Sequence, residues 1–400
     1  MIPDPQTAEK RVAATGSALT DVTPLFELAR AGRESTGRTF NLESRPMIPE
    51  HRPVKRIVTA CSELIGGTPL YELARTGSGS RLLLKLEQFN PTGSCKVRMA
   101  REMILAAERD GKLKPGGHIV EPTSGNTGTG LALVAIERGY KFTAVVDHHA
   151  ARDKLRAMQA MGVNLVFAES KGGGPSTIAR RRLAEEIVQK TGAFWPDQHT
   201  NPNNNQGYAG LAAELLHDLD TDIDYLVGTV GTGGTMCGTV KELRRLGSKV
   251  TSIGIEPVGS IIFGGPPGKY WQTGAGAPGG FTVGPNVDHS LIDEGLTVHD
   301  IDAFTAARVV ARRTGILVGG TSGAAIHIAL KRLALVEPNS TMVVLICDAG
   351  EKYLDSVYND EWLRERHLLD ELAHQRLHRL FDAYRDSIRL ASRNRAAVGG

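Results

Sequence analysis

The stretch Asn90-Pro91-Thr92-Gly93-Ser94-Cys95-Lys96-Val97-Arg98 places a single lysine directly after a Pro/Gly/Ser turn and directly before a helical pattern. An ammonium at its usual pKa, about 10.4, is a poor nucleophile at neutral pH, whereas a desolvated or electrostatically depressed amine can form an imine with an aldehyde. Most lysines are solvated surface charges, so Lys96 alone would carry little weight. Two further segments strengthen the case that Lys96 is a functional residue. They are Thr123-Ser124-Gly125-Asn126-Thr127-Gly128 and Gly231-Thr232-Gly233-Gly234-Thr235.

Both segments are polar turns between an expected strand and an expected helix. The 231–235 segment follows the apolar run Tyr225–Thr229 and precedes the helical pattern Met236–Arg245. Glycines let several backbone N–H groups converge, and a helix N-terminus adds partial positive charge, so such a turn suits a phosphate. The segment fits neither the dinucleotide nor the P-loop glycine pattern. By the same reasoning the 123–127 segment suits a carboxylate, although either segment alone could be a purely structural turn.

The composition indicates a globular enzyme rather than a nucleic-acid or membrane protein. The chain has 400 residues, of which 41% are hydrophobic and 23% charged, with a formal charge of +3. This length allows more than one domain, and no long basic run indicates nucleic acid as a partner. No stretch approaches the ~18 apolar residues of a membrane helix, and the N-terminus lacks an apolar signal core. The four cysteines include no Cys-x-x-Cys pair, so we expect a reduced, cytoplasmic protein without zinc or disulfides.

From Thr59 onward, strand and helix patterns alternate, which predicts an α/β fold with helices covering a mainly parallel sheet. The expected strands are Leu82–Leu86, His118–Glu121, Phe142–Val146, Leu165–Phe167, Tyr225–Thr229, Ser252–Glu256 and Met342–Cys347. The expected helices include Arg98–Arg109, Asn126–Arg138, Ala151–Met161, Thr177–Gln189 and Ile301–Thr314. A further helical pattern at Leu363–Ile388 predicts a helix that docks on the body or on a second subunit.

The three segments, in this order, resemble the cysteine synthase and cystathionine β-synthase family of enzymes that use pyridoxal 5'-phosphate (PLP), over about Thr59 to Asp360. The resemblance implies PLP fold type II, with two open-sheet α/β domains, the cofactor in the cleft between them, and a homodimer. It also sets the expected boundaries. These are an N-terminal extension at 1–57, a large PLP-binding domain at 58–91 and 196–360, a small substrate-gripping domain at 92–195, and a C-terminal helical tail at 361–400.

The resemblance also implies a role for each matching residue. Lys96 would hold PLP as an imine and then act as the general base. The phosphate would lie on Gly231, Thr232, Gly233, Gly234 and Thr235, while Asn126 would contact the ring hydroxyl. The substrate amino acid would be bound by Thr123, Ser124, Gly125, Thr127, Gln198 and Gly274, the last in the glycine-rich loop 264–284 expected at the mouth of the site. The segment Gly319-Gly320-Thr321-Ser322-Gly323 is similar to a family segment near the cofactor.

Two positions depart from the family pattern. Cysteine synthases have a serine beside the pyridine nitrogen, whereas this chain has Ala349, preceded by Asp348. Ala349 cannot hydrogen-bond the nitrogen, so Asp348, a water or another group takes over, or the nitrogen has no partner. Because the preceding position usually points away in similar folds, we expect an uncharged ring. The second departure is Val97, where the family commonly has an aspartate.

The resemblance predicts β-replacement: an O-acetyl- or O-phospho-L-serine passes through an α-aminoacrylate and becomes a β-substituted alanine. The runs 259–264 and 351–363 are similar to the amine-using synthases of 2,3-diaminopropionate precursors, which favours a specialised pathway. Sulfide and homocysteine are the other candidate nucleophiles. The alternatives are a β-eliminating lyase or dehydratase, and a PLP-fold binding protein that has lost catalysis. No metal is expected, because His374 and His378 have helical pair spacing but no third ligand.

Overall fold

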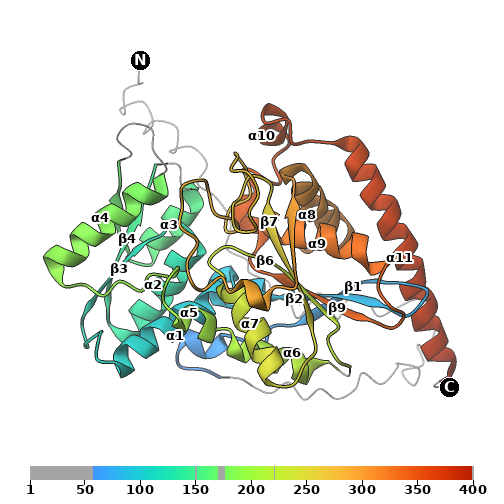
Figure 1. Cartoon of the computed structure of the whole chain (residues 1–400), viewed down its shortest axis with the longest axis horizontal. Helices are drawn as coiled ribbons and strands as arrows, with labels where there is room; N and C mark the ends of the chain where they lie inside the picture. Colours follow the sequence, from blue (N-terminus) through green and yellow to red (C-terminus); the bar gives the residue numbers. More distant parts are fainter. Residues whose placement is uncertain (1–56, 149–150, 170–175, 220, 399–400) are drawn as a thin grey trace, which may run out of the picture. The chain divides into compact units, whose positions relative to one another are not determined.

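Residues 58–400 contain two β-sheets, and helices cover the larger one (Figure 1). The computed structural model describes residues 57–148, 151–169, 176–219 and 221–398. The six-stranded sheet has the order β1-β2-β9-β6-β7-β8, in which β1 is antiparallel to β2 and the other pairs are parallel. Its strands are β1 (Leu70–Arg75), β2 (Arg81–Leu86), β6 (Tyr225–Thr229), β7 (Thr251–Pro257), β8 (Glu294–Val298) and β9 (Thr341–Ile346).

The second sheet has three parallel strands in the order β3-β4-β5. These are β3 (His118–Pro122), β4 (Lys141–Val146) and β5 (Asn164–Phe167). The accompanying helices are α1 (Lys96–Arg109), α2 (Asn126–Arg138), α3 (Arg152–Ala160) and α4 (Ser176–Thr191). All of these elements fall between residues 92 and 195, the expected small domain, whose limits stay a proposal. The predicted extension at 1–57 lies almost entirely outside the described residues.

Alternating side chains on the central strands bury both faces of the six-stranded sheet. Leu83, Val343 and Leu345 belong to a core shared with α6 (Ala209–Asp218) and α7 (Gly234–Arg245). Leu82, Leu84, Met342, Val344 and Ile346 belong to a second core, shared with α8 (Asp300–Thr314) and α9 (Gly320–Leu333). A strand that is buried on both faces has a nearly continuous apolar sequence, and for this reason β2 and β9 could be predicted from the sequence.

Each of the seven predicted strands is confirmed to within a few residues, but two edge strands were missed. The sequence of β8, Glu-Gly-Leu-Thr-Val, alternates between half-buried and exposed positions before the buried Val298, and it carries little apolar signal. The other missed strand, β1, is the single antiparallel strand of its sheet. Three helices were also missed: α5 (Asn203–Gln206), α6 and α9. α9 starts with Gly-Thr-Ser-Gly, poor helix formers whose placement is fixed by packing against α8.

The C-terminal pattern forms two helices, α10 (Asp360–Glu365) and α11 (Glu371–Val398), instead of one. His367 between them has a φ of 55°, a left-handed conformation that ends a helix. α11 packs on α8 and β1, and its buried residues are Ala373, Leu377, Phe381 and Tyr384. Of the two predicted alternatives, the structure therefore shows the helix that docks on the body of its own chain. His378 Nδ1 accepts a hydrogen bond from Arg313 Nε at 2.8 Å. Within the described ranges, no helix is both long and apolar enough to span a bilayer.

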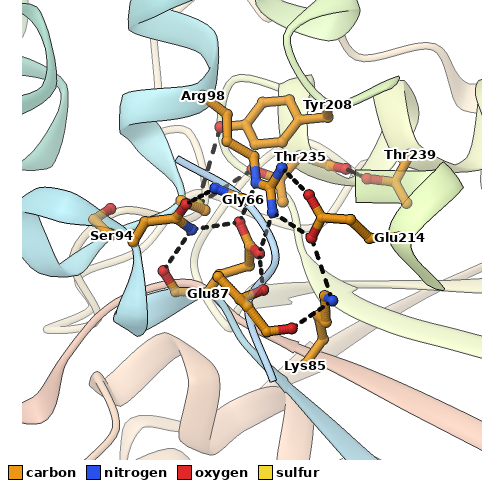
Figure 2. A network of polar contacts seen from close by, with 12 residues as sticks. Gly66, Lys85, Glu87, Ser94, Arg98, Tyr208, Glu214, Thr235 and Thr239 are labelled. Carbon is orange, nitrogen blue, oxygen red and sulfur yellow. Dashed lines mark hydrogen bonds and ion pairs between the residues drawn. The ribbon is translucent and has the colours of Figure 1, made fainter. Parts of the chain in front are cut away.

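A buried ionic network holds the start of α1 (Figure 2). Arg98 donates to both carboxylate oxygens of Glu87, at 2.6 and 2.8 Å, and to both of Glu214, each at 2.8 Å. Lys85 lies 3.3 Å from Glu214. Although burial lowers the pKa of Arg98, the charges of Glu87 and Glu214 outweigh it and raise that pKa above its ordinary value. The guanidinium therefore stays charged and fixes the helix two residues beyond Lys96.

Candidate active site

Lys96 is the first residue of α1 and lies beside the end of β9. The Cys95 N–H donates to the Cys347 carbonyl at 2.9 Å, and Ser94 forms a β-bridge with Asp348. These contacts tie the residues before Lys96 to the residues after β9. Val97 is fully buried in the core, which explains why this position carries no charge. The chain therefore presents Lys96 from a rigid helix start rather than from a free loop.

Nearly all of the residues singled out by sequence line two cavities. The cavities share six lining residues, which are Lys96, Asn126, Gly231, Thr232, Thr273 and Gly274. The larger has a volume of about 900 Å³, and the smaller, of about 30 Å³. The predicted residues on their walls are Lys96, Thr123, Ser124, Gly125, Asn126, Thr127, Gln198, Gly231, Thr232, Gly233, Gly234, Thr235, Gly274 and Asp348. Ala349 is not among the lining residues, and its N–H donates to the Gly93 carbonyl at 3.1 Å.

The 231–235 segment forms a tight turn from β6 into α7. Gly233 has a φ of +89°, and a Cβ there would collide with the backbone of Asn286, so only glycine fits. No side chain in the described part of the chain caps the N-terminus of α7. The Thr232 hydroxyl accepts from Asn204 Nδ2 at 3.0 Å. The first N–H groups of α7 and the hydroxyls of the turn can therefore bind an anion.

The 123–127 segment joins β3 to α2, with Gly125 as the residue before the helix. The Thr127 hydroxyl donates to Gln198 Oε1 at 2.8 Å, which brings two of the predicted substrate-binding residues together. Arg180 on α4 lies 3.1 Å from the Asp147 carboxylate and 3.3 Å from the Ser124 hydroxyl. This loop therefore combines a helix N-terminus, hydroxyls and a nearby guanidinium.

A buried carboxyl group supports the segment that carries Gln198. Glu121 accepts from the N–H groups of Asp197 and Gln198, at 3.0 and 3.4 Å. Burial and the nearby Asp197 charge raise the pKa of Glu121 to about 8. The adjacent His199 lines the larger cavity, and burial lowers its pKa to about 4. His199 is therefore a neutral imidazole at neutral pH.

A chain of hydrogen bonds passes through Asp348. Its Oδ2 accepts from Asn126 Nδ2 at 2.7 Å and from the Tyr353 hydroxyl at 2.6 Å. Lys352 Nζ donates to Asn126 Oδ1 at 2.7 Å, and Lys154 Nζ lies 3.2 Å from the Tyr353 hydroxyl. Asp348 Oδ1 is buried and has no hydrogen-bond partner among the described residues. The side chain of Asp348 contacts Asn126, and the residue lines the smaller cavity.

Sequence reasoning missed several residues that line the larger cavity. The cationic ones are Arg152, Lys154, Arg180, Lys352 and Arg366, and the aromatic ones include His199, Trp271, Phe281, Phe304, Tyr353 and Trp362. The runs 259–264 and 351–363 are similar to amine-using synthases in sequence, but their positions relative to Lys96 depend on tertiary structure. Nothing in the sequence around Lys154 or Arg180 indicates a site.

Comparisons with known proteins agree with this arrangement. Residues 61–348 match the family model of the pyridoxal-phosphate dependent enzymes. A Sinorhizobium fredii protein provisionally assigned as a cysteine synthase is 48% identical over 292 residues, which cover 72% of this chain and 87% of that protein. The N-(2-amino-2-carboxyethyl)-L-glutamate synthase of Ralstonia nicotianae is 36% identical over 71% of this chain and 84% of its own length.

The fold agrees with solved structures of the same group. The crystal structure of the O-acetylserine dependent cystathionine β-synthase of Helicobacter pylori superposes with a TM-score of 0.70. The two sequences are 32% identical, and the match covers 76% of this chain and 100% of that chain. The predicted α/β fold of PLP fold type II is thereby confirmed. The chain belongs to the family of pyridoxal-phosphate dependent enzymes, among the transferases of the cysteine synthase type.

Proposed function

We propose that this enzyme replaces the oxygen-linked group on Cβ of an O-acetyl- or O-phospho-L-serine with a nucleophile, giving a β-substituted alanine. One observation carries the proposal: Lys96, the 123–127 loop and the 231–235 turn line connected walls of the same cavity system. β-Replacement on PLP requires an amine for the aldehyde, an anion site for the phosphate and a second anion site for the substrate carboxylate. The three segments supply these in one place.

The residues on the cavity wall fit PLP. Lys96 would hold the aldehyde, Asn126 the ring hydroxyl, and the uncapped start of α7 the phosphate. The glycine at 233 leaves the backbone there without a Cβ, and Asp348 Oδ1 offers a buried acceptor that lacks a partner. When bound, PLP supplies an electron sink for the electron pair that remains at Cα after proton removal.

The side chains of the 123–127 loop would orient the donor amino acid. The N-terminus of α2 and the hydroxyls of Thr123, Ser124 and Thr127 would bind its α-carboxylate, while Gln198 is held in place by Thr127. Lys96 Nζ would then take the proton from Cα. Because that amine is already at the reacting carbon, its effective concentration is high.

Asp348 is the side chain that we assign to the ring nitrogen. Its Oδ2 shares a hydrogen bond with Asn126, and its buried Oδ1 is without a partner among the described residues. A carboxylate at this position would stabilise a protonated ring, which revises the sequence-based hypothesis of an uncharged one. Ala349, in the position of the family serine, is turned toward Gly93 and does not line the cavities.

Replacing Lys96 with Ala tests the proposal. We expect the purified, cofactor-loaded wild type to convert O-acetyl- or O-phospho-L-serine, with sulfide as nucleophile, into a β-substituted alanine detectable by mass spectrometry. Loss of the general base should lower turnover by about 10²–10⁴-fold or more in Lys96→Ala. Lys112→Ala, on a 65% exposed side chain, is the matched control and should keep wild-type turnover.

Two results would contradict the proposal. Full turnover by Lys96→Ala would remove the assigned base, and pyruvate release at the same rate with and without a nucleophile would indicate a lyase. Circular dichroism of the variant should match that of the wild type. The homodimer, the cytoplasmic location and the domain limits stay predictions from the resemblance and the composition.

A further inference from the structure

The larger cavity extends from Lys96 to a group of residues that the reaction at Lys96 does not use. We call Trp271, Phe304, Val357, Trp362 and Arg366 the aromatic annex, and all five line this cavity. They come from the 264–284 loop, α8, and the segment through α10, three parts of the chain that are distant in sequence. Tyr353 connects the annex with the Lys96 end, because it contacts Asp348 and also lines the larger cavity.

The annex combines aromatic rings in edge-to-face and tilted contact with a cation. The Trp271 and Trp362 rings lie 5.5 Å apart at 78°, and Phe304 lies 6.2 Å from Trp362. The Arg366 guanidinium lies 4.9 Å from the centre of the Trp271 ring and 4.4 Å from that of Trp362. Cation–π contacts with the two indoles orient the guanidinium.

The framework fixes this group independently of any ligand. The N–H groups of Trp271 and Gln272 donate to the Asp300 carboxylate at 2.8 and 3.1 Å. Asn359 caps α10 by accepting from the Trp362 N–H at 3.0 Å. Arg308 donates to the Val357 carbonyl at 3.1 Å and forms an ion pair with Asp360. A preformed site loses less entropy when it binds a ligand.

Arg366 has hydrogen-bonding capacity that the described residues do not use. Its Nη1 donates to the Trp362 carbonyl at 3.1 Å and to Glu365 at 2.9 Å, but its Nε is buried without a partner. Arg366 forms an ion pair with Glu365 but also lines the cavity, so the exposed part of its guanidinium can pair with a bound carboxylate. The cationic lining residues are Lys96, Arg152, Lys154, Arg180, Lys352 and Arg366, against the acidic Asp147, Asp153 and Asp355. This excess of positive charge favours anionic ligands.

The size of the cavity is far greater than sulfide needs. Its volume of about 900 Å³ lies near the upper end of the roughly 300–1,000 Å³ range of pockets for drug-sized ligands. A donor serine derivative bound by the 123–127 loop would occupy one end of this cavity. The aromatic annex is therefore available to a second molecule of similar or larger size.

We propose that the aromatic annex binds the second substrate, an amino acid whose amine or thiol is the nucleophile and whose carboxylate pairs with Arg366. The inference rests on the proposed β-replacement. The nucleophile's lone pair forms the new bond to Cβ of the donor, and the Cβ–O bond breaks with its electron pair going to the leaving oxygen. The proton lost by the nucleophile balances the charge of the leaving group, and nothing is oxidised or reduced.

Steady-state kinetics of Arg366→Gln test the proposal, with L-glutamate, L-homocysteine and sulfide compared as nucleophiles at a fixed donor concentration. Loss of a charge-assisted hydrogen bond should raise the KM of the preferred amino acid by about 10–100-fold. The KM of sulfide, which has no carboxylate to pair with Arg366, should stay within about twofold of wild type. Arg364→Gln, on a 63% exposed side chain of α10, is the matched control and should behave as wild type.

A binding measurement makes the test independent of turnover. The chain has three tryptophans, and two of them, Trp271 and Trp362, belong to the annex. In a Trp195→Phe background, glutamate or homocysteine added to the cofactor-loaded enzyme without donor should change the fluorescence saturably. This change should be lost in Arg366→Gln and kept in Arg364→Gln.

Other outcomes would overturn the inference. One is an Arg366→Gln effect of equal size on sulfide, which would mean that Arg366 acts on the donor or the fold. Another is an enzyme that uses sulfide but neither amino acid, with no fluorescence response in the wild type. If no nucleophile is incorporated but the saturable, Arg366-dependent fluorescence change is present, the proposed function fails while the binding site stands.

Discussion

Asp348 lies at the centre of the hydrogen-bonded chain that joins Lys352, Asn126, Tyr353 and Lys154. Asn126 begins α2 and Lys154 lies in α3, two helices that accompany the three-stranded sheet. Asp348 follows β9 of the six-stranded sheet. Burial lowers the pKa of both Lys154 and Lys352, while the Asp348 carboxylate acts in the opposite direction. A single carboxylate therefore holds one side of the site to the other.

Replacing Asp348 with Asn tests its assignment to the ring nitrogen. Asn keeps the size and an acceptor oxygen for Asn126 and Tyr353 but removes the charge that would stabilise a protonated ring. We expect a shifted visible absorbance band of the bound cofactor and a turnover about tenfold lower, as expected for the loss of about 1.4 kcal/mol from a charge-assisted hydrogen bond.

Ala349→Ser is the matched comparison for that experiment, because it restores the family serine at a position that does not line the cavities. We expect its absorbance band and turnover to match wild type. The assignment would be wrong if Ala349→Ser shifted the band while Asp348→Asn left both the band and the turnover unchanged.

Among the elements, α1 depends most clearly on distant parts of the chain. The helical pattern of α1 and the lysine at its start are both visible in the sequence. The sequence does not show that Arg98 is buried between Glu87 and Glu214, 11 and 116 residues away along the chain. Periodicity reveals which residues form a helix, whereas the partners that fix its position come from tertiary packing.

Arg98→Met should strongly destabilise the protein. The change leaves Glu87, which is fully buried, without its counter-charge, and breaking a buried pair in this way costs about 3–5 kcal/mol. Arg109→Met, on a 60% exposed side chain of the same helix, removes only a surface pair and should cost less than about 1 kcal/mol. Urea denaturation of the two variants gives both free energies of unfolding, and equal losses would show that the buried network does not hold α1.

At the scale of the whole molecule, the sequence predicted those features that local signals encode. The apolar runs of β2 and β9 and the glycine turn at 231–235 are readable directly, and 14 of the predicted site residues, all except Ala349, line the two cavities. The contacts of Asp348 with Asn126 and Tyr353 could not be predicted, because they depend on the course of the turn after β9. The aromatic annex was not predicted, since its five residues converge only through the packing of α8, α10 and the 264–284 loop.

The site of covalent cofactor attachment is the decisive measurement, because Lys154 and Lys352 also line the larger cavity. The native, PLP-loaded enzyme would be reduced with borohydride, digested and analysed by mass spectrometry. We predict that the reduced cofactor is found on the peptide that contains Lys96. An unmodified Lys96, with the cofactor on Lys154, on Lys352 or on no lysine at all, would contradict the account.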